Sequence, residues 1–291
     1  MKRLIITADD FGASDEVNEA VEEAHQRGVL TAASLMAGGA AAADAVRRAE
    51  RNPGLRVGLH LALSEGAPVL PASQLPDLVT RAGDLRSDLA ALGAAIFFKP
   101  SARRQAAAEM EAQFEAFRRT GLALDHVNAH QHFHLHPTIG DLLLKLGRAY
   151  GLAASRVPVE PRSVLRAVEG GSVPSAFFVD VWARRLRARF RQNGILVADQ
   201  VFGLAWSGAM TEPRLSGLIR RLPEGLTEVY LHPATSGDFK WAAPGYRYAE
   251  ELAALTAPET REAILQSGAK LGAFSDFTPS AAPSASAAAR R

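Results

Sequence analysis

Histidine is concentrated in one short segment of this chain. Five of the eight histidines lie in DHVNAHQHFHLHP, residues 125–137, at every second position except for Asn128. The residues between them are mostly apolar, and a period of two is typical of a β-strand, so the pattern predicts a strand over 125–133 with one nitrogen-rich face. The histidines on that face are His126, His130, His132, His134 and His136. Because burying unpaired imidazoles costs free energy, such a face favours a metal site over a packed core.

The geometry of a strand limits how many of these histidines one ion can bind. Alternate residues on a strand lie about 6.6 Å apart, whereas metal–nitrogen bonds are about 2.0–2.1 Å long. One ion can therefore take one or at most two of them. The others must orient substrate, hydrogen-bond to the ligands or lie at the mouth of the site, and surface display of the whole stripe is the alternative.

Other expected strands end in residues that bind metals or move protons. Asp9 and Asp10 end the first strand, His60 lies in the third, and His232 follows LTEVYL. In parallel α/β folds such ends meet at one rim of the sheet. Adjacent strand residues point to opposite faces, so both aspartates can face the site only if the strand turns there, which Gly12 permits. An isolated strand histidine such as His60 is more often structural, and the combination carries the metal hypothesis.

These residues need a scaffold in which strands and helices alternate. Apolar residues at helical spacing precede Gly28, Gly121 and Gly151, as expected of helix ends. Seven or eight strand–helix units predict an α/β fold with a parallel sheet closed into a TIM-like (β/α) barrel of about seven strands. We expect a single domain over 1–278, an insertion at about 64–100 and a low-complexity, disordered tail at 279–291. The expected strands are 3–8, 31–37, 56–63, 125–133, 155–159, 195–198, 226–231 and 270–274.

Composition excludes several classes of protein. The 291 residues are 47% hydrophobic and 22% charged, which is typical of a soluble globular protein. No apolar run approaches the roughly 20 residues that span a bilayer, and MKRLIITADD reads as a first strand rather than a signal peptide. The absence of cysteine fits a reducing cytoplasm and excludes thiolate chemistry. A net charge of +2 argues against a nucleic-acid partner, and the arginines of 184–191 read as a solvated helix face.

Four motifs in order carry a family resemblance. ITADDFG, GLHL at 58–61, NAHQHFHLHP and LHP at 231–233 resemble the YdjC-like family of carbohydrate deacetylases, over most of the chain to about residue 277. Within that family DHVNAHQHFHLHP, the insertion and the closing GAFSDF are most similar to the hopanoid-biosynthesis-associated branch, HpnK. The resemblance implies a distorted (β/α) barrel in which one divalent ion is held by Asp10, His60 and His130. It further implies that Asp9 is the general base and His232 the general acid.

Two positions depart from the family pattern. Many relatives read DSHHHVH where this chain reads NAHQHFH, so Asn128 replaces an aspartate and Gln131 a histidine. Neither change removes an implied ligand. An amide, however, cannot raise the basicity of a ligand imidazole as a carboxylate does, which puts the surroundings of the ion in question.

The implied reaction is hydrolysis of the N-acetyl group of an N-acetylglucosaminyl conjugate. Two imidazoles and one carboxylate leave open positions for water and substrate oxygen; this ligand set favours Zn²⁺, whereas the family is commonly described with Mg²⁺. The branch implies a hopanoid substrate, hence a cytoplasmic enzyme working at the inner membrane surface, and leaves a homo-oligomer open. Arg156 is expected to hold Asp9 ionised, bind substrate or form a surface ion pair. Expected substrate contacts are His132, His134, Arg156, Trp241 and Tyr246.

Several alternatives remain at this point. A deacetylase of soluble chitooligosaccharides would use the same residues, and so would another mononuclear metallohydrolase. A phosphoesterase with two ions would need more ligands than one carboxylate and two histidines. A histidine-rich metal-binding protein without enzymatic activity would need neither Asp9 nor His232.

Overall fold

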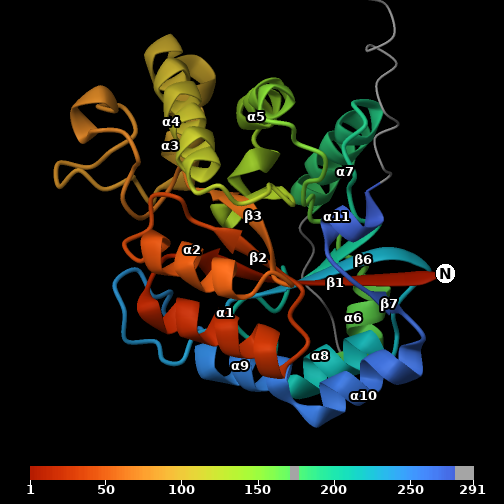
Figure 1. Cartoon of the computed structure of the whole chain (residues 1–291). Coiled ribbons are helices and arrows are strands. Elements are labelled where there is room, and N and C mark those ends of the chain that lie inside the picture. The colour runs from red at the N-terminus through yellow and green to blue at the C-terminus, as the bar shows by residue number, and fades with distance from the viewer. Residues whose placement is uncertain (171–176, 279–291) are drawn as a thin grey trace, which may run out of the picture.

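The computed structural model describes residues 1–170 and 177–278. In this part of the chain the centre is a seven-stranded parallel sheet with the order β4-β3-β2-β1-β6-β5, and β7 pairs with β1. The sheet curls into a half-barrel surrounded by helices (Figure 1), which confirms the predicted distorted TIM-like (β/α) barrel. The strands are β1 (Lys2–Phe11), β2 (Ala32–Leu35), β3 (Arg56–Leu61), β4 (Val127–Ala129), β5 (Gln200–Phe202), β6 (Gly225–Leu231) and β7 (Lys270–Leu271).

Helices cover the sheet on both sides (Figure 1). α1 shows how the sequence specifies them, since Ser14 caps its first turn by accepting from the Val17 N–H at 3.3 Å and its apolar stripe is buried. The helix ends at Gly28, as predicted. The helices are α1 (Asp15–Arg27), α2 (Ala42–Arg51), α3 (Leu89–Phe98), α4 (Pro100–Arg119), α5 (Pro137–Ala149), α6 (Arg162–Glu169), α7 (Phe177–Gln192), α8 (Glu212–Ile219), α9 (Tyr248–Thr256), α10 (Pro258–Ser267) and α11 (Phe274–Phe277), with 3-10 turns η1 (Ala72–Gln74) and η2 (His130–Leu135).

The wall between β4 and β5 differs from the prediction. The strands expected at 155–159 and 195–198 reduce to two isolated bridges, Val127–Ser155 and Ala154–Leu196, and the paired strand lies further on, at 200–202. Pro158 explains the first loss, because proline has no backbone N–H to donate to a neighbouring strand.

The histidine segment is the larger correction. β4 ends at Ala129, and the chain then enters η2, in which Gln131 and His132 have positive φ values of 51° and 52°. Within the sheet, β4 pairs with residues 59–61 of β3, and β3 itself ends at Leu61; on its other side β4 has the bridge from Val127 to Ser155. No neighbouring strand is therefore available beyond Ala129 to satisfy the backbone of an extended chain. The predicted strand over 125–133 is wrong beyond 129, and the histidines do not share one face.

The insertion at 64–100 is more ordered than a long loop. It contains η1, an antiparallel bridge between Val79 and Leu85, and α3. α3 has the sequence LAALGAAIFF, and its lack of polar residues hides the helical period that would otherwise reveal it. The buried Glu109 of α4 holds the insertion by accepting the N–H groups of Val69 and Leu70 at 2.8 and 2.9 Å. The tail expected to be disordered, 279–291, lies outside the described residues.

No helix within 1–170 and 177–278 is both long enough and apolar enough to cross a membrane.

Candidate active site

The end of β1 turns in a way that brings both of its aspartates to one cavity. The pairing of β1 with β2 shifts register between Ala8 and Phe11, and Asp10 has a left-handed φ of 63°. This bulge removes the strict alternation of a strand. Asp9 and Asp10 both line the cavity, as expected if the strand turns at this point. Gly12, with φ 92°, continues the turn.

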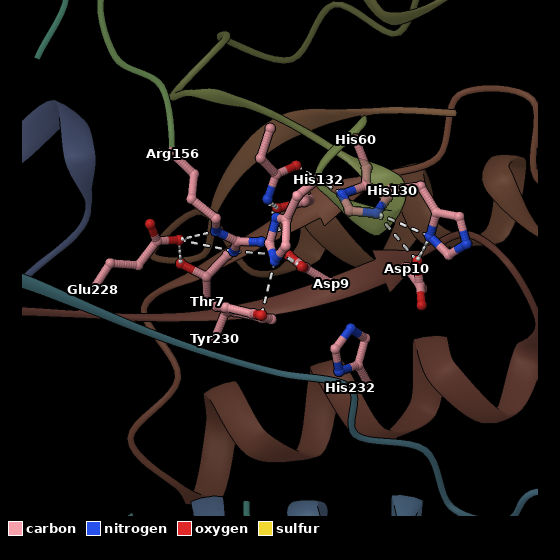
Figure 2. Close-up of polar contacts among 12 residues, drawn as sticks. Thr7, Asp9, Asp10, His60, His130, His132, Arg156, Glu228, Tyr230 and His232 are labelled. Atoms are coloured by element: carbon pink, nitrogen blue, oxygen red, sulfur yellow. Dashed lines mark hydrogen bonds and ion pairs between the residues drawn. The ribbon is translucent and has the colours of Figure 1, made fainter. Parts of the chain in front are cut away.

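Asp10, His60 and His130 bring three ligand atoms together (Figure 2). Asp10 Oδ1 lies 3.2 Å from His60 Nε2 and 3.1 Å from His130 Nδ1, and the two ring nitrogens are 3.4 Å apart. Three donors with these separations can surround one ion at bond lengths of about 2.0–2.1 Å. Of the residues that the structure describes, this is the group with metal-binding geometry, and it consists of the three implied ligands.

Each imidazole of this triad is held through its other nitrogen. His60 Nδ1 lies 2.7 Å from Asn128 Oδ1, and His130 Nε2 lies 3.3 Å from Glu65 Oε2. Such contacts leave the His60 Nε2 and His130 Nδ1 lone pairs for an ion. No sequence motif marks Glu65, which lies at the start of the insertion and could be found only from the folded chain.

The electrostatics of the triad favour a cation. Burial lowers the pKa of His130, but the carboxylates of Asp10 and Glu65 outweigh burial and raise it to about 10. For Asp10, burial acts in the opposite direction and raises the pKa. The contacts with His130 and His60 outweigh burial, so the pKa of Asp10 lies well below its usual value. In the metal-free protein the group thus holds a proton where an ion would bind.

Asp9 is held by a buried arginine (Figure 2). Arg156 is fully buried and donates to both carboxylate oxygens of Asp9, with Nη2 at 2.9 Å from Oδ1. Its Nε donates to Glu228 at 2.8 Å, and its guanidinium lies 4.2 Å from the centre of the Tyr230 ring. Burial raises the pKa of Asp9, but the charge of Arg156 outweighs it and the pKa lies far below the ordinary value. Asp9 is therefore an ionised carboxylate that lines the cavity.

Removing Arg156 should cost much of the protein's stability. Arg156→Met leaves the buried carboxylates of Asp9 and Glu228 without their cation. We expect the free energy of unfolding to fall by about 3–5 kcal/mol. Urea denaturation at neutral pH measures this. Arg191→Met is the matched control, since Arg191 pairs with Asp199 at the surface and should cost less than about 1 kcal/mol. Equal losses in the two variants would contradict the assigned role.

The cavity above these groups has a volume of about 620 Å³. His232, at the end of β6, and His132 line it together with the two aspartates. The His232 ring centre is 5.1 Å from that of Tyr246, and the His132 Nε2 is 2.8 Å from the hydroxyl of Tyr230. Aromatic side chains complete one wall: Phe239, Trp241, Tyr246 and Tyr248.

Two expected substrate contacts do not reach this cavity. His134 and Arg156 are both fully buried, and neither belongs to the cavity wall formed by the described residues. His134 Nε2 donates instead to the Arg156 carbonyl at 2.9 Å. The expectation for His134 rested on strand alternation, which fails once the chain enters η2. Of the three roles left open for Arg156, the geometry favours holding Asp9, because all of its contacts are buried.

Buried His134 should make stability depend on pH. Burial lowers its pKa from 6.5 to about 4, so between these values the unfolded chain binds a proton that the folded chain does not. Stability is then complete above pH 6.5 and falls as the pH drops toward 4, by about 1 kcal/mol per pH unit. We expect His134→Gln to flatten this slope in urea titrations made with a chelator. An unchanged slope would show that His134 titrates normally in the folded protein.

Comparisons with known proteins place this chain in a family. Residues 3–266 match the sequence profile of the YdjC-like protein family. A human protein named carbohydrate deacetylase is 32% identical over 303 residues, covering 94% of this chain and 91% of that protein. A protein of the same name from Geobacillus stearothermophilus is 32% identical over 277 residues, covering 94% and 97%.

A solved structure supports the fold. The crystal structure of a protein from Enterococcus faecalis V583, named for cellobiose-phosphate cleavage, has a TM-score of 0.76 at 24% identity and covers 96% of this chain and 99% of that one. With the profile match extending over most of the sequence, this chain belongs to the YdjC-like protein family.

Proposed function

We propose that this protein is a metal-dependent N-deacetylase that hydrolyses the acetamide of an N-acetylglucosaminyl conjugate to the free amine and acetate. One observation carries the proposal: a metal-binding triad, an ionised carboxylate and a histidine face the same cavity. Relatives at 32% identity are named carbohydrate deacetylase, which supports the class of substrate. Asp10, His60 and His130 hold the ion; Asp9 and His232 are the catalytic pair.

The residues divide the reaction between them. A bound ion supplies Lewis acidity toward the acetamide carbonyl. Asp9, kept ionised by Arg156, takes a proton from the attacking water in the cavity that it lines. His232 donates a proton to the departing nitrogen, because an amine must leave in protonated form. Two nitrogen ligands and one oxygen favour Zn²⁺ on chemical grounds, and Mg²⁺ is the other candidate.

We propose a hopanoid as the group attached to the sugar, as in the hopanoid-biosynthesis-associated branch of the family. The lining of the cavity supports this, since residues 36–41, MAGGAA, form part of it without any charged or polar side chain. Such a wall suits an apolar aglycone. Trp241 and Tyr246 offer ring faces against which a sugar can stack.

A lipid-linked substrate requires contact with a membrane, and α3 supports such contact. Its last two residues, Phe97 and Phe98, are 46% and 77% exposed, and the exposed Lys99 follows them. Aromatic side chains flanked by cations are typical of surfaces that bind anionic bilayers. Phe97 also lies 6.1 Å, between ring centres, from His136, which follows η2. We place the enzyme in the cytoplasm at the inner membrane surface.

Acetate release from two substrates tests the proposal. We expect turnover of an N-acetylglucosaminyl hopanoid in vesicles, with slower turnover of chitotriose. Faster turnover of chitotriose would instead support the second candidate, a deacetylase of soluble chitooligosaccharides. The half-exposed Trp241 at the rim of the cavity favours this candidate. No acetate from either substrate in the metal-loaded protein would overturn the deacetylase assignment.

The exposed phenylalanines give a prediction about the membrane. Phe97→Ser with Phe98→Ser should lower the rate on vesicle-borne substrate about tenfold or more, because each buried aromatic contributes about 1.5–3 kcal/mol to binding an apolar phase. The rate on the same sugar with a short soluble aglycone should not change. Acetate release measures both, and Leu265→Ser is the control, since Leu265 is also 77% exposed but lies on α10. An equal loss in the control would contradict a specific membrane-binding surface.

A further inference from the structure

Asn128 lies between the proposed base and a proposed metal ligand. Its Nδ2 donates to Asp9 Oδ1 at 3.0 Å, and its Oδ1 is 2.7 Å from His60 Nδ1. An ionised carboxylate can only accept hydrogen bonds, so Asp9 determines which end of the amide carries the hydrogens. The oxygen must then face His60, whose Nδ1 carries the hydrogen, and the Nε2 lone pair is left facing Asp10 and His130.

A second contact extends this network away from the cavity. Asn128 Nδ2 also donates to Ser34 Oγ at 2.8 Å, and Ser34 Oγ lies 3.0 Å from His126 Nε2. Since Ser34 accepts from Asn128, its own hydrogen is available for His126. The carboxylate of Asp125 can only accept, so His126 carries its hydrogen on Nδ1, which lies 2.9 Å from Asp125 Oδ2, and its Nε2 is left to accept from Ser34.

The Asp125–His126–Ser34 group resembles the triad of a serine hydrolase in residue types and order of contacts. It is not a nucleophilic site, because Ser34 and His126 are fully buried and Asp125 is 5% exposed. The His126 ring is stacked on Phe274 with ring centres 4.5 Å apart, and the Ser275 N–H donates to Asp125 Oδ1 at 2.8 Å. These contacts shield the three residues from solvent and hold the carboxylate of Asp125 in place.

We propose that Asn128, Ser34, His126 and Asp125 form a directional hydrogen-bond relay that positions His60 for the ion. Each member donates to the next, from His60 through Asn128, Ser34 and His126 to the carboxylate of Asp125. The relay fixes the tautomer of His60, and a branch at Asn128 fixes the orientation of Asp9. All four are positioning residues, and their role rests on the proposed metal site.

The relay gives a reason for an amide at position 128. A carboxylate there would also accept from His60, but it could not donate to Asp9 or Ser34 and would add a negative charge 3.0 Å from Asp9 Oδ1. The amide serves the base and the ligand at once. A carboxylate polarises a ligand histidine in other metal sites; here the relay ends on the carboxylate of Asp125, with three side chains between it and His60.

Histidine nitrogens observed by ¹⁵N NMR test the relay without metal or substrate. In the metal-free protein we expect His126 to carry a hydrogen on Nδ1 and none on Nε2. In Asn128→Asp the Ser34 hydroxyl turns to the new carboxylate, so His126 must donate from both nitrogens, and a second hydrogen should appear on Nε2. Resonances are assigned with His126→Gln. A hydrogen on Nε2 of His126 in the unaltered protein, or no change in Asn128→Asp, overturns the relay.

Zn²⁺ affinity provides the second measurement. Loss of a residue that orients a ligand weakens metal binding about 10–100-fold, and we expect Asn128→Ala and Ser34→Ala to lie in that range, with Ser34→Ala nearest roughly tenfold. Ser216→Ala, a 3% exposed serine on α8, should bind as the unaltered protein does. Equal affinity of Ser34→Ala and the control overturns the relay.

The two proposals can fail separately. The tautomer of His126 is read in the protein without metal, so it can contradict the relay even if acetate release is found. Conversely, a confirmed relay in a protein that releases no acetate would overturn the deacetylase assignment alone. Urea unfolding of each metal-free variant shows whether it is folded.

Discussion

Replacing Asp9 by asparagine is expected to lower acetate release about 10²–10⁴-fold, the range for loss of a general base. The amide has the shape of the carboxylate and can still accept from Arg156, but it cannot take a proton from water. Asp9 also lies outside the triad of ligand atoms. We therefore expect the variant to retain close to one ion per chain in elemental analysis while turnover is nearly lost.

This combination separates the competing explanations. Asp141→Asn is the control, because the Asp141 side chain is 57% exposed in a surface pair with Arg189, and it should retain full activity. A histidine-rich metal-binding protein predicts the same metal content for Asp9→Asn but no activity to lose. Full deacetylase activity in Asp9→Asn would show that another group is the base.

Loss of a ligand should have the second large effect. His130→Ala removes one of three donors that lie 3.1–3.4 Å apart, so the protein should be purified with far less than one ion per chain and should lose both turnover and the stabilisation that added Zn²⁺ produces. Binding stabilises the folded state by an amount that increases with the ratio of the free Zn²⁺ concentration to its Kd. Thermal unfolding with and without Zn²⁺ measures this, together with elemental analysis.

A neighbouring histidine offers a matched control. His136 lies in the same histidine-rich segment, partly buried beside Phe97 and Phe133, and has no contact with the triad. His136→Ala should keep the ion and the Zn²⁺-dependent shift in Tm. If His130→Ala still binds one ion tightly, the triad is not the metal site, and a count near two ions in the unaltered protein would favour the phosphoesterase alternative.

The local sequence was sufficient for the parts of the site that depend on residue identity. Asp10, His60 and His130 come together as the family motifs imply, and Asp9 faces the same cavity. The ends of β1 and β6 were readable because polar residues follow a strand pattern there, Asp9 and Asp10 in β1 and His232 after β6, whereas His60 lies inside β3, one residue before its end. In parallel α/β folds such ends meet at one rim, so proximity followed from the order of elements without knowledge of any contact.

Contacts between distant segments determined the rest. Period-two alternation describes the local backbone, but the strand stops at Ala129 because β3 stops beside it, and the histidines then diverge. Arg156 and Asp9 are 147 residues apart, as Ser34 and His126 are 92, and no local pattern records such pairs. A buried ion pair or hydrogen-bond chain depends on which side chains packing brings within about 3 Å, and that is a property of the folded chain.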